Sequence, residues 1–128
     1  MVIDASALVA ILTGEPELDL FERAIARAAT RKISPVNWFE TVTVLGSRSA
    51  ELKNAFNRYS ALTRIEIIPI DTRQAELAVQ AQQVYGKGRH PAKLNLGDCF
   101  AYALAKAMRE PLLFKGGDFA HTDIVPAL

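Results

Sequence analysis

The first twelve residues constrain the fold of this chain more than any other stretch. Met1 to Ile3 form an apolar segment without a polar face, which is typical of a strand buried on both sides of a parallel sheet. Residues Ala5–Leu12 are dominated by alanine and leucine, and they predict a helix that is apolar all round. Asp4 lies between them, at the carboxyl end of the predicted strand, where open α/β sheets bind their ligands. This carboxylate either caps the helix or belongs to a binding site, and both interpretations are open at this point.

The composition is that of an ordinary globular protein. With 128 residues, half of them hydrophobic and 23% charged, we expect a single domain over residues 1–128. A net charge of +1 provides no basic field, so any contact with nucleic acid must come from a local patch. Cys99 is the only cysteine, which excludes an intrachain disulfide and a cysteine-based zinc cluster. Because we find neither a leader sequence nor an apolar run approaching the roughly 20 residues that span a bilayer, we expect a soluble, cytoplasmic protein.

Predicted strands and helices alternate along the chain. Spacing and capping signals predict further helices over about 16–29, 35–45, 51–62, 72–85 and 95–109. Further strands are predicted at 33–34, 65–70 and 111–114, with a short edge strand at 124–125. The helix over 51–62 is expected to bury one apolar face, made of Leu52, Ala55, Phe56, Tyr59 and Leu62. Strands separated by helices in this way form a parallel sheet that is covered on both faces.

Four acidic residues stand apart from the others. Asp4 ends the first strand, and Asp118 follows the last predicted strand before 124–125. Glu40 lies one turn into the helix after the second strand, and Asp98 lies in the first turn of the last helix. Because strand ends and the starts of the following helices share one edge of a parallel sheet, we expect these four carboxylates to converge. The remaining acidic residues mostly fit exposed helix faces: Glu15, Glu17, Asp19, Glu22, Glu51, Glu76 and Glu110.

Convergence of carboxylates has an electrostatic consequence. Two carboxylates about 4 Å apart repel each other by roughly 4 kcal/mol at an effective dielectric constant near 20. Either their pKa values rise or a hard cation occupies the site. An oxygen-only set of ligands suits Mg²⁺ or Mn²⁺ better than zinc. Such ions activate water and bind phosphate oxygens in phosphodiester hydrolysis.

Four stretches of this chain resemble the motifs of PIN-domain ribonucleases: Ile3–Ser6, the helical Glu40, Leu96–Leu104 and Lys115–Phe119. They are most similar to the VapC-type toxins of bacterial toxin–antitoxin modules, and the resemblance extends from residue 1 to about residue 125. It implies a three-layer α/β/α fold with a central parallel sheet. It also implies Mg²⁺-dependent endonucleolytic cleavage of RNA, with Mn²⁺ as a substitute ion.

The resemblance further assigns roles to individual residues. Asp4 and Asp98 would bind the metal directly, and Glu40 and Asp118 would complete the acidic quartet, partly through metal-bound water molecules. The hydroxyl group of Ser6 would hold Asp4 in place. The sequence departs from the family just before Asp118, where a glycine occupies a position that is often polar in related sequences. This glycine gives Asp118 a more flexible backbone.

The resemblance also implies partners, namely a second copy of the chain in a homodimer and a small antitoxin protein. The antitoxin would lay an apolar segment across the second to fourth helices and direct a basic side chain toward the acidic site. In agreement with a docking surface, these helices carry more large aromatic residues than one side of a thin domain readily buries. The aromatic residues concerned are Phe21, Trp38, Phe56 and Tyr59.

Several other residues admit two interpretations. Asp98 could serve only as a helix cap, and the same is expected of Asp71, which opens a capping box. Asp123 either supports the metal ligands or is an ordinary loop residue. The loop before the last helix holds basic side chains that either contact RNA or are simply solvated: Lys87, Arg89, His90 and Lys93.

Other classes of protein fit the pattern less well. A haloacid-dehalogenase-type phosphatase needs a second aspartate where this chain has Ser6, and a receiver domain needs an acidic pair beside Asp4. A nucleotide-binding domain would have a glycine-rich loop after the first strand. The main alternative is a PIN-like module that binds RNA or a partner without turnover. Loss of an acidic position would mark that class, and all four positions are present.

Overall fold

A four-stranded parallel sheet forms the middle layer of the protein. The computed structural model describes residues 1–128. The strands lie in the order β3-β2-β1-β4, and each neighbouring pair is parallel. Their bounds are β1 Val2–Ile3, β2 Lys32–Ile33, β3 Glu66–Ile67 and β4 Leu112–Leu113. The predicted parallel sheet is therefore confirmed.

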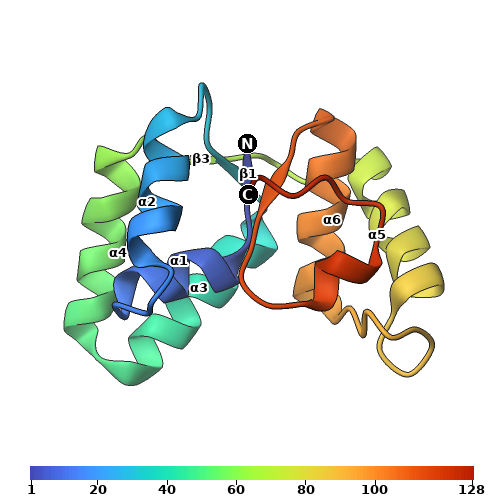
Figure 1. Cartoon of the computed structure of the whole chain (residues 1–128), viewed down its shortest axis with the longest axis horizontal. Coiled ribbons are helices and arrows are strands. Elements are labelled where there is room, and N and C mark those ends of the chain that lie inside the picture. The colour runs from blue at the N-terminus through green and yellow to red at the C-terminus, as the bar shows by residue number, and fades with distance from the viewer.

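Helices cover both faces of this sheet. Figure 1 shows α1 to α4 on one side and α5 and α6 on the other, with β1 between them. The bounds are α1 Ala5–Leu12, α2 Leu18–Arg27, α3 Pro35–Arg48, α4 Ala50–Leu62, α5 Thr72–Tyr85 and α6 Leu96–Met108, followed by a 3₁₀ turn, η1, over Asp118–His121. The predicted three-layer α/β/α arrangement is thus confirmed. No helix is both long and apolar enough to cross a membrane.

Alternation along the strands divides the core into two halves. Val2 and Leu112 belong to the cluster that packs with α5 and α6. Ile3, Ile33 and Leu113 belong to the cluster that packs with α1 to α4. Because successive side chains of a strand point to opposite faces, a strand of two apolar residues contributes one residue to each half. This explains why β1 has no polar face.

Each helix begins within two residues of its predicted start. Ser34 accepts a hydrogen bond from the backbone nitrogen of Val36, one residue after the proline that opens α3. Asp71 caps α5 through the backbone nitrogen of Gln74, at 2.8 Å. The structural role expected for Asp71 is therefore confirmed.

The chain departs from prediction at several ends of elements. The strand predicted over 65–70 pairs only at Glu66–Ile67, where both residues are exposed at the edge of the sheet. Residues 124–125 form no strand, and the nearby pairing is a single bridge between Leu112 and Pro126. Leu62, predicted to be buried, is 83% exposed. It ends α4 at the margin of the buried helix face, beside an open cavity, so nothing packs over it.

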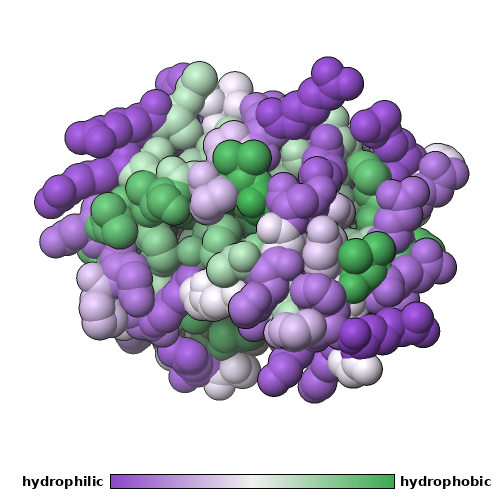
Figure 2. Space-filling view, turned by 45° about the vertical axis from the view of Figure 1, so that its right-hand side comes forward, coloured by the Kyte–Doolittle hydropathy of each residue, from purple (hydrophilic) through white to green (hydrophobic).

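The prediction that the large aromatic residues of α2 to α4 are exposed is wrong. Phe21 and Phe56 are only 5% and 0% exposed, and Trp38 and Tyr59 are half-buried. The rings of Trp38 and Phe56 pack against each other with their centroids 4.7 Å apart. These aromatic side chains fill the space between the helices themselves. Hydrophilic residues dominate the face shown in Figure 2, and hydrophobic ones form separate patches on it.

Three acidic residues expected on solvated faces are instead paired and half-buried. Lys115 forms ion pairs with Glu15 and Glu17. Glu110 lies 2.9 Å from the ammonium group of Lys32 and 3.4 Å from the terminal amine. These pairs hold the termini of strands and helices together, and their pairing with cations separates them from the unpaired acidic quartet.

Candidate active site

Asp4 acts both as a helix cap and as a buried carboxylate. It is 5% exposed at the end of β1, and its Oδ2 accepts hydrogen bonds from the backbone nitrogen and the hydroxyl group of Ser6, at 3.0 and 2.6 Å. The Ser6 hydroxyl in turn accepts a hydrogen bond from the backbone nitrogen of Lys115, at 2.9 Å. The two interpretations of Asp4 are therefore compatible, and Ser6 ties it to the loop that follows β4.

Glu40 lies on α3, where its carboxylate is held between Asn37 and Gly97. Its Oε1 accepts a hydrogen bond of 2.9 Å from the side-chain amide of Asn37, one turn earlier on the helix. On its other side it meets the backbone of α6 at Gly97, where a Cβ atom would lie 2.2 to 2.4 Å from the Glu40 carboxylate. Only glycine fits there without displacing Glu40.

Asp98 caps α6, as the structural alternative predicted. The side chain of Asn95 accepts a hydrogen bond from the backbone nitrogen of Asp98, and Asp98 Oδ2 accepts one from the backbone nitrogen of Asn95, at 2.9 and 3.1 Å. This reciprocal pair fixes the Asp98 side chain at the start of the helix. Capping does not remove Asp98 from the acidic group, because its charge interacts with those of Asp4, Glu40 and Asp118.

Burial and mutual repulsion raise the pKa values of three of the four carboxyl groups. Burial is the main cause for Asp4, whose pKa rises to about 6, and the nearby Glu40 adds to it. Burial likewise raises the pKa of Asp98 to about 6, with added repulsion from Asp4 and Asp118. The pKa of Glu40 is raised by burial and by Asp98. These repulsions show that the four residues of the predicted quartet lie near one another at one edge of the sheet, with Asp118 on the exposed turn η1.

The four carboxylates do not form a closed cage. No three acidic, histidine or cysteine side chains stand close enough together to hold a metal ion as they are placed. An Mg²⁺ ion nevertheless suits such a set, because it keeps several water molecules and binds through one or two carboxylates. A set of carboxylate oxygen donors with raised pKa values fits a hydrated divalent cation.

Asp123 lies away from this group. Its carboxylate accepts hydrogen bonds from the hydroxyl of Tyr102 and the ammonium of Lys106, at 2.8 and 2.7 Å. Tyr102 and Lys106 are one and two turns beyond Asp98 on α6. No hydrogen bond links Asp123 to the quartet, so the supporting role predicted for it is not found. It anchors the C-terminal segment to α6 instead.

The basic residues for which the sequence left RNA contact or simple solvation open lie on a loop between α5 and α6. Lys87, Arg89 and Lys93 are all exposed. A bridge between Gly86 and Leu94 closes the base of the loop just before α6 begins. The loop therefore leads directly to the helix that carries Asp98.

Two residues of the site, Asn37 and Gly97, were not identified from the sequence. Asn37 stands three residues before Glu40, a spacing that places both on one side of a helix. It is also a weak helix former on the buried face of α3. Gly97 immediately precedes Asp98 in a helix start, where glycine has no conformational advantage unless something approaches it closely.

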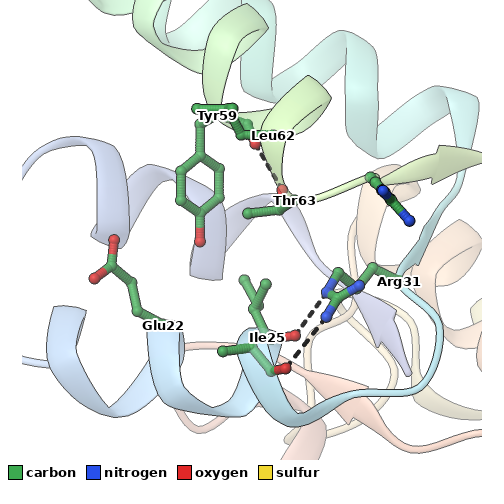
Figure 3. A pocket seen from close by; sticks show the side chains of 8 residues that line it. Glu22, Ile25, Arg31, Tyr59, Leu62 and Thr63 are labelled. Atoms are coloured by element: carbon green, nitrogen blue, oxygen red, sulfur yellow. Dashed lines mark hydrogen bonds between the residues drawn. The ribbon is translucent and has the colours of Figure 1, made fainter.

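Two of the five cavities in the structure bear on the site, and one of these two adjoins the carboxylates. A cavity of about 440 Å³ beside them is lined by Ser6, Glu40 and Lys115, among others. A cavity of about 590 Å³ lies between α2 and α4 (Figure 3), where the Arg31 guanidinium binds backbone carbonyl groups of α2. Arg31 directly precedes β2, so this second cavity lies at the opposite edge of the sheet from the carboxylates.

Comparison with known proteins agrees with this fold. The sequence profile of the PIN domain matches residues 1–125, and the chain therefore belongs to the PIN-domain family. Within that family it groups with the VapC ribonucleases. The Ribonuclease VapC of Mycolicibacterium smegmatis is 46% identical over 125 residues, which cover 97% of each chain.

Solved structures show the same fold. VapC20 of Mycobacterium tuberculosis, a sarcin-ricin loop cleaving toxin, superposes with a TM-score of 0.77 at 19% identity, covering 97% of this chain and 95% of that one. A toxin–antitoxin complex from Klebsiella pneumoniae superposes with a TM-score of 0.73 at 25% identity, covering 99% of this chain and 97% of that one.

Proposed function

We propose that this protein is a metal-dependent endoribonuclease and the toxin of a toxin–antitoxin pair. The observation that carries the proposal is the group of four carboxylates at the carboxyl edge of the sheet, three of them with raised pKa values. Membership of the VapC group supports cleavage of RNA in particular. A module without turnover is disfavoured, because no acidic position of the quartet is missing.

Asp4 and Asp98 are the residues we propose as direct ligands of Mg²⁺, for which Mn²⁺ would substitute. Glu40 and Asp118 complete the site, partly through water molecules. A bound Mg²⁺ would activate water for attack on phosphorus and stabilise negative charge on the phosphate oxygens. Ser6 keeps Asp4 oriented through its two hydrogen bonds, and the capping pair does the same for Asp98.

The proposed substrate reaches the site past the basic loop. Lys87, Arg89 and Lys93 are exposed next to the start of α6, so they can meet phosphate groups of an RNA strand without rearrangement. Their contribution would weaken with increasing salt, as contacts to phosphate do. A cytoplasmic location is part of the same proposal, since the substrate is cellular RNA.

The proposed partner is an antitoxin protein, because a solved structural neighbour is a toxin–antitoxin complex. Its apolar segment would lie across α2 to α4, where Leu20 and Leu62 are 51% and 83% exposed beside separate cavities. An antitoxin arginine could pair with a carboxylate of the site and compete with the cation. We also propose that two copies of the chain form a homodimer, as the resemblance to VapC-type toxins implies.

The activity is tested by sequencing the 5′ ends of RNA after induction of the protein in cells. The wild-type protein should create new 5′ ends at defined positions, whereas Asp4→Asn should create none at a comparable protein level. New ends of equal abundance with Asp4→Asn would contradict the proposed role of the quartet.

A further inference from the structure

Asn37 is a buried side chain that touches three separate parts of the site. It is 0% exposed on α3. Its side-chain nitrogen lies 2.9 Å from Glu40 Oε1, 3.0 Å from the carbonyl oxygen of Gly97 and 3.4 Å from Asp4 Oδ1. Asn37 therefore links the end of β1, the first turns of α3 and the start of α6.

The chemistry of these neighbours fixes the orientation of the Asn37 amide. Each of the three is an oxygen acceptor, so the NH₂ group must face them and the carboxamide oxygen must face away. The two amide hydrogens are best directed to the two nearer acceptors, Glu40 and Gly97. No other hydrogen bond reaches the Glu40 carboxylate, whereas Asp4 also has both donors of Ser6.

The backbone at Gly97 completes this arrangement. Without a Cβ atom at Gly97, the Glu40 carboxylate can lie against α6. Asn37 holds both the carboxylate and the Gly97 carbonyl oxygen, and so it sets the separation of α3 from α6 where they carry Glu40 and Asp98. Loss of the amide would leave Glu40 free to turn toward solvent.

We propose that Asn37 is a positioning residue, which holds the Glu40 and Asp4 carboxylates at the spacing that binding of a divalent cation requires. The inference rests on the proposed metal-dependent function. Residues that orient metal ligands typically contribute about 10- to 100-fold to metal affinity or activity. Asn37 acts through the carboxylates and needs no contact with the RNA.

The test compares Asn37→Leu with Thr41→Val. Leucine keeps the branching of asparagine at Cγ and removes both polar atoms. Thr41 is equally buried on α3, and its hydroxyl donates a hydrogen bond of 2.8 Å to the backbone oxygen of Asn37. Thr41→Val therefore removes a buried hydrogen bond without changing any donor to the carboxylates. Mn²⁺ is the probe, its binding followed by electron paramagnetic resonance, alongside the Tm of each metal-free protein.

Asn37→Leu should weaken Mn²⁺ binding by about 10- to 100-fold. It should also lower kcat for RNA cleavage and leave KM for RNA unchanged. Thr41→Val should bind Mn²⁺ like the wild type, whatever its Tm. If Asn37→Leu does not fold, Asn37→Ala takes its place in the same comparison.

Mn²⁺ affinity within twofold of the wild type in a folded Asn37 variant would overturn the positioning role, even if Tm fell. Failure of the wild-type protein itself to bind Mn²⁺ is a different result. That result would overturn the proposed metal-dependent function, and the positioning role with it.

Discussion

At the scale of single residues, Asp98 combines a structural and a chemical role that one substitution can separate. Asparagine at this position still accepts the hydrogen bond from the backbone of Asn95, so Asp98→Asn keeps the cap and removes the charge. RNA cleavage should fall by orders of magnitude. The metal-free variant should be no less stable than the wild type, because repulsion from Asp4 and Asp118 is relieved. Cleavage assays and urea unfolding measure the two effects.

The control for this substitution is Asp71→Asn. Asp71 caps α5 through Gln74 and has no contact with the quartet. Asparagine caps helices as well as aspartate does, so this variant should keep wild-type activity. An inactive Asp71→Asn combined with an active Asp98→Asn would mean that the carboxylates have been assigned to the wrong roles.

The raised pKa values predict how the stability of the metal-free protein depends on pH. The folded pKa of Asp4, about 6, exceeds the value near 4 of an unfolded chain, so the folded state binds the proton more tightly. The resulting stabilisation is present below about pH 4 and is lost as the pH rises through about 6. For Asp4 alone this amounts to roughly 2 to 3 kcal/mol of unfolding free energy.

Glu110 and Asp123 have lowered pKa values, so their effect on the pH dependence of stability is opposite to that of Asp4. The test therefore compares the unfolding free energies of two proteins that share these residues. Urea unfolding in EDTA should show wild-type stability declining between about pH 4.5 and pH 7 relative to an Asp4→Asn/Asp98→Asn double variant. Parallel pH profiles for the two proteins would show that neither carboxyl group has a raised pKa.

At the scale of elements, the starts of helices were well predicted and the lengths of strands were not. Ser34, Asp71 and Asn95 cap helices through local hydrogen bonds, and such bonds depend on only a few neighbouring residues. Pairing of a strand depends on the neighbour that the sheet provides. The apolar run at 65–70 lies at the edge of the sheet, so only two of its residues pair.

The contact between α3 and α6 could not be predicted from the sequence. Sequence spacing placed Glu40 and Asp98 at the same edge, and the order of the strands bears this out. The Asn37 amide and the gap at Gly97 depend on how closely two helices approach, a distance that no local pattern encodes. The same holds for Asp123, whose partners lie 17 and 21 residues away on α6.

Gly97→Ala tests this contact between elements. The added methyl group would meet the Glu40 carboxylate at 2.2 to 2.4 Å, so Glu40 must move. We expect cleavage and Mn²⁺ affinity to fall by about tenfold or more while the helix content, followed by circular dichroism, stays unchanged.

The matched control is Gly46→Ala, which changes another glycine inside a helix. A Cβ atom at Gly46 would meet only the Lys53 side chain, at 3.6 Å. This variant should keep full activity, and stability should rise by about 0.5 to 1 kcal/mol from helix propensity. Equal losses of activity in both variants would argue against a specific contact between Gly97 and Glu40.

At the scale of the whole molecule, alternation of strands and helices predicted the layers but not the surface. The two apolar residues of β1 and of β4 predicted a parallel sheet, because strands buried on both faces need a sheet that is covered on both sides. The aromatic residues of α2 to α4 were misassigned because residue type does not tell whether a ring packs inside or outside. The rings of Trp38 and Phe56 pack against each other, and Leu62, which was predicted to be buried, lines the cavity drawn in Figure 3.

The most direct test of the account is the metal dependence of RNA cleavage by the purified protein. The protein is stripped with EDTA, and Mg²⁺ is added back at fixed ionic strength while cleavage of a defined RNA and Tm are followed. Cleavage should be absent after chelation and return with Mg²⁺ or Mn²⁺, and Tm should rise with the ion, since binding to the folded state relieves repulsion among the carboxylates. Cleavage that persists at the wild-type rate after rigorous chelation would contradict the central claim that the acidic quartet works through a bound cation.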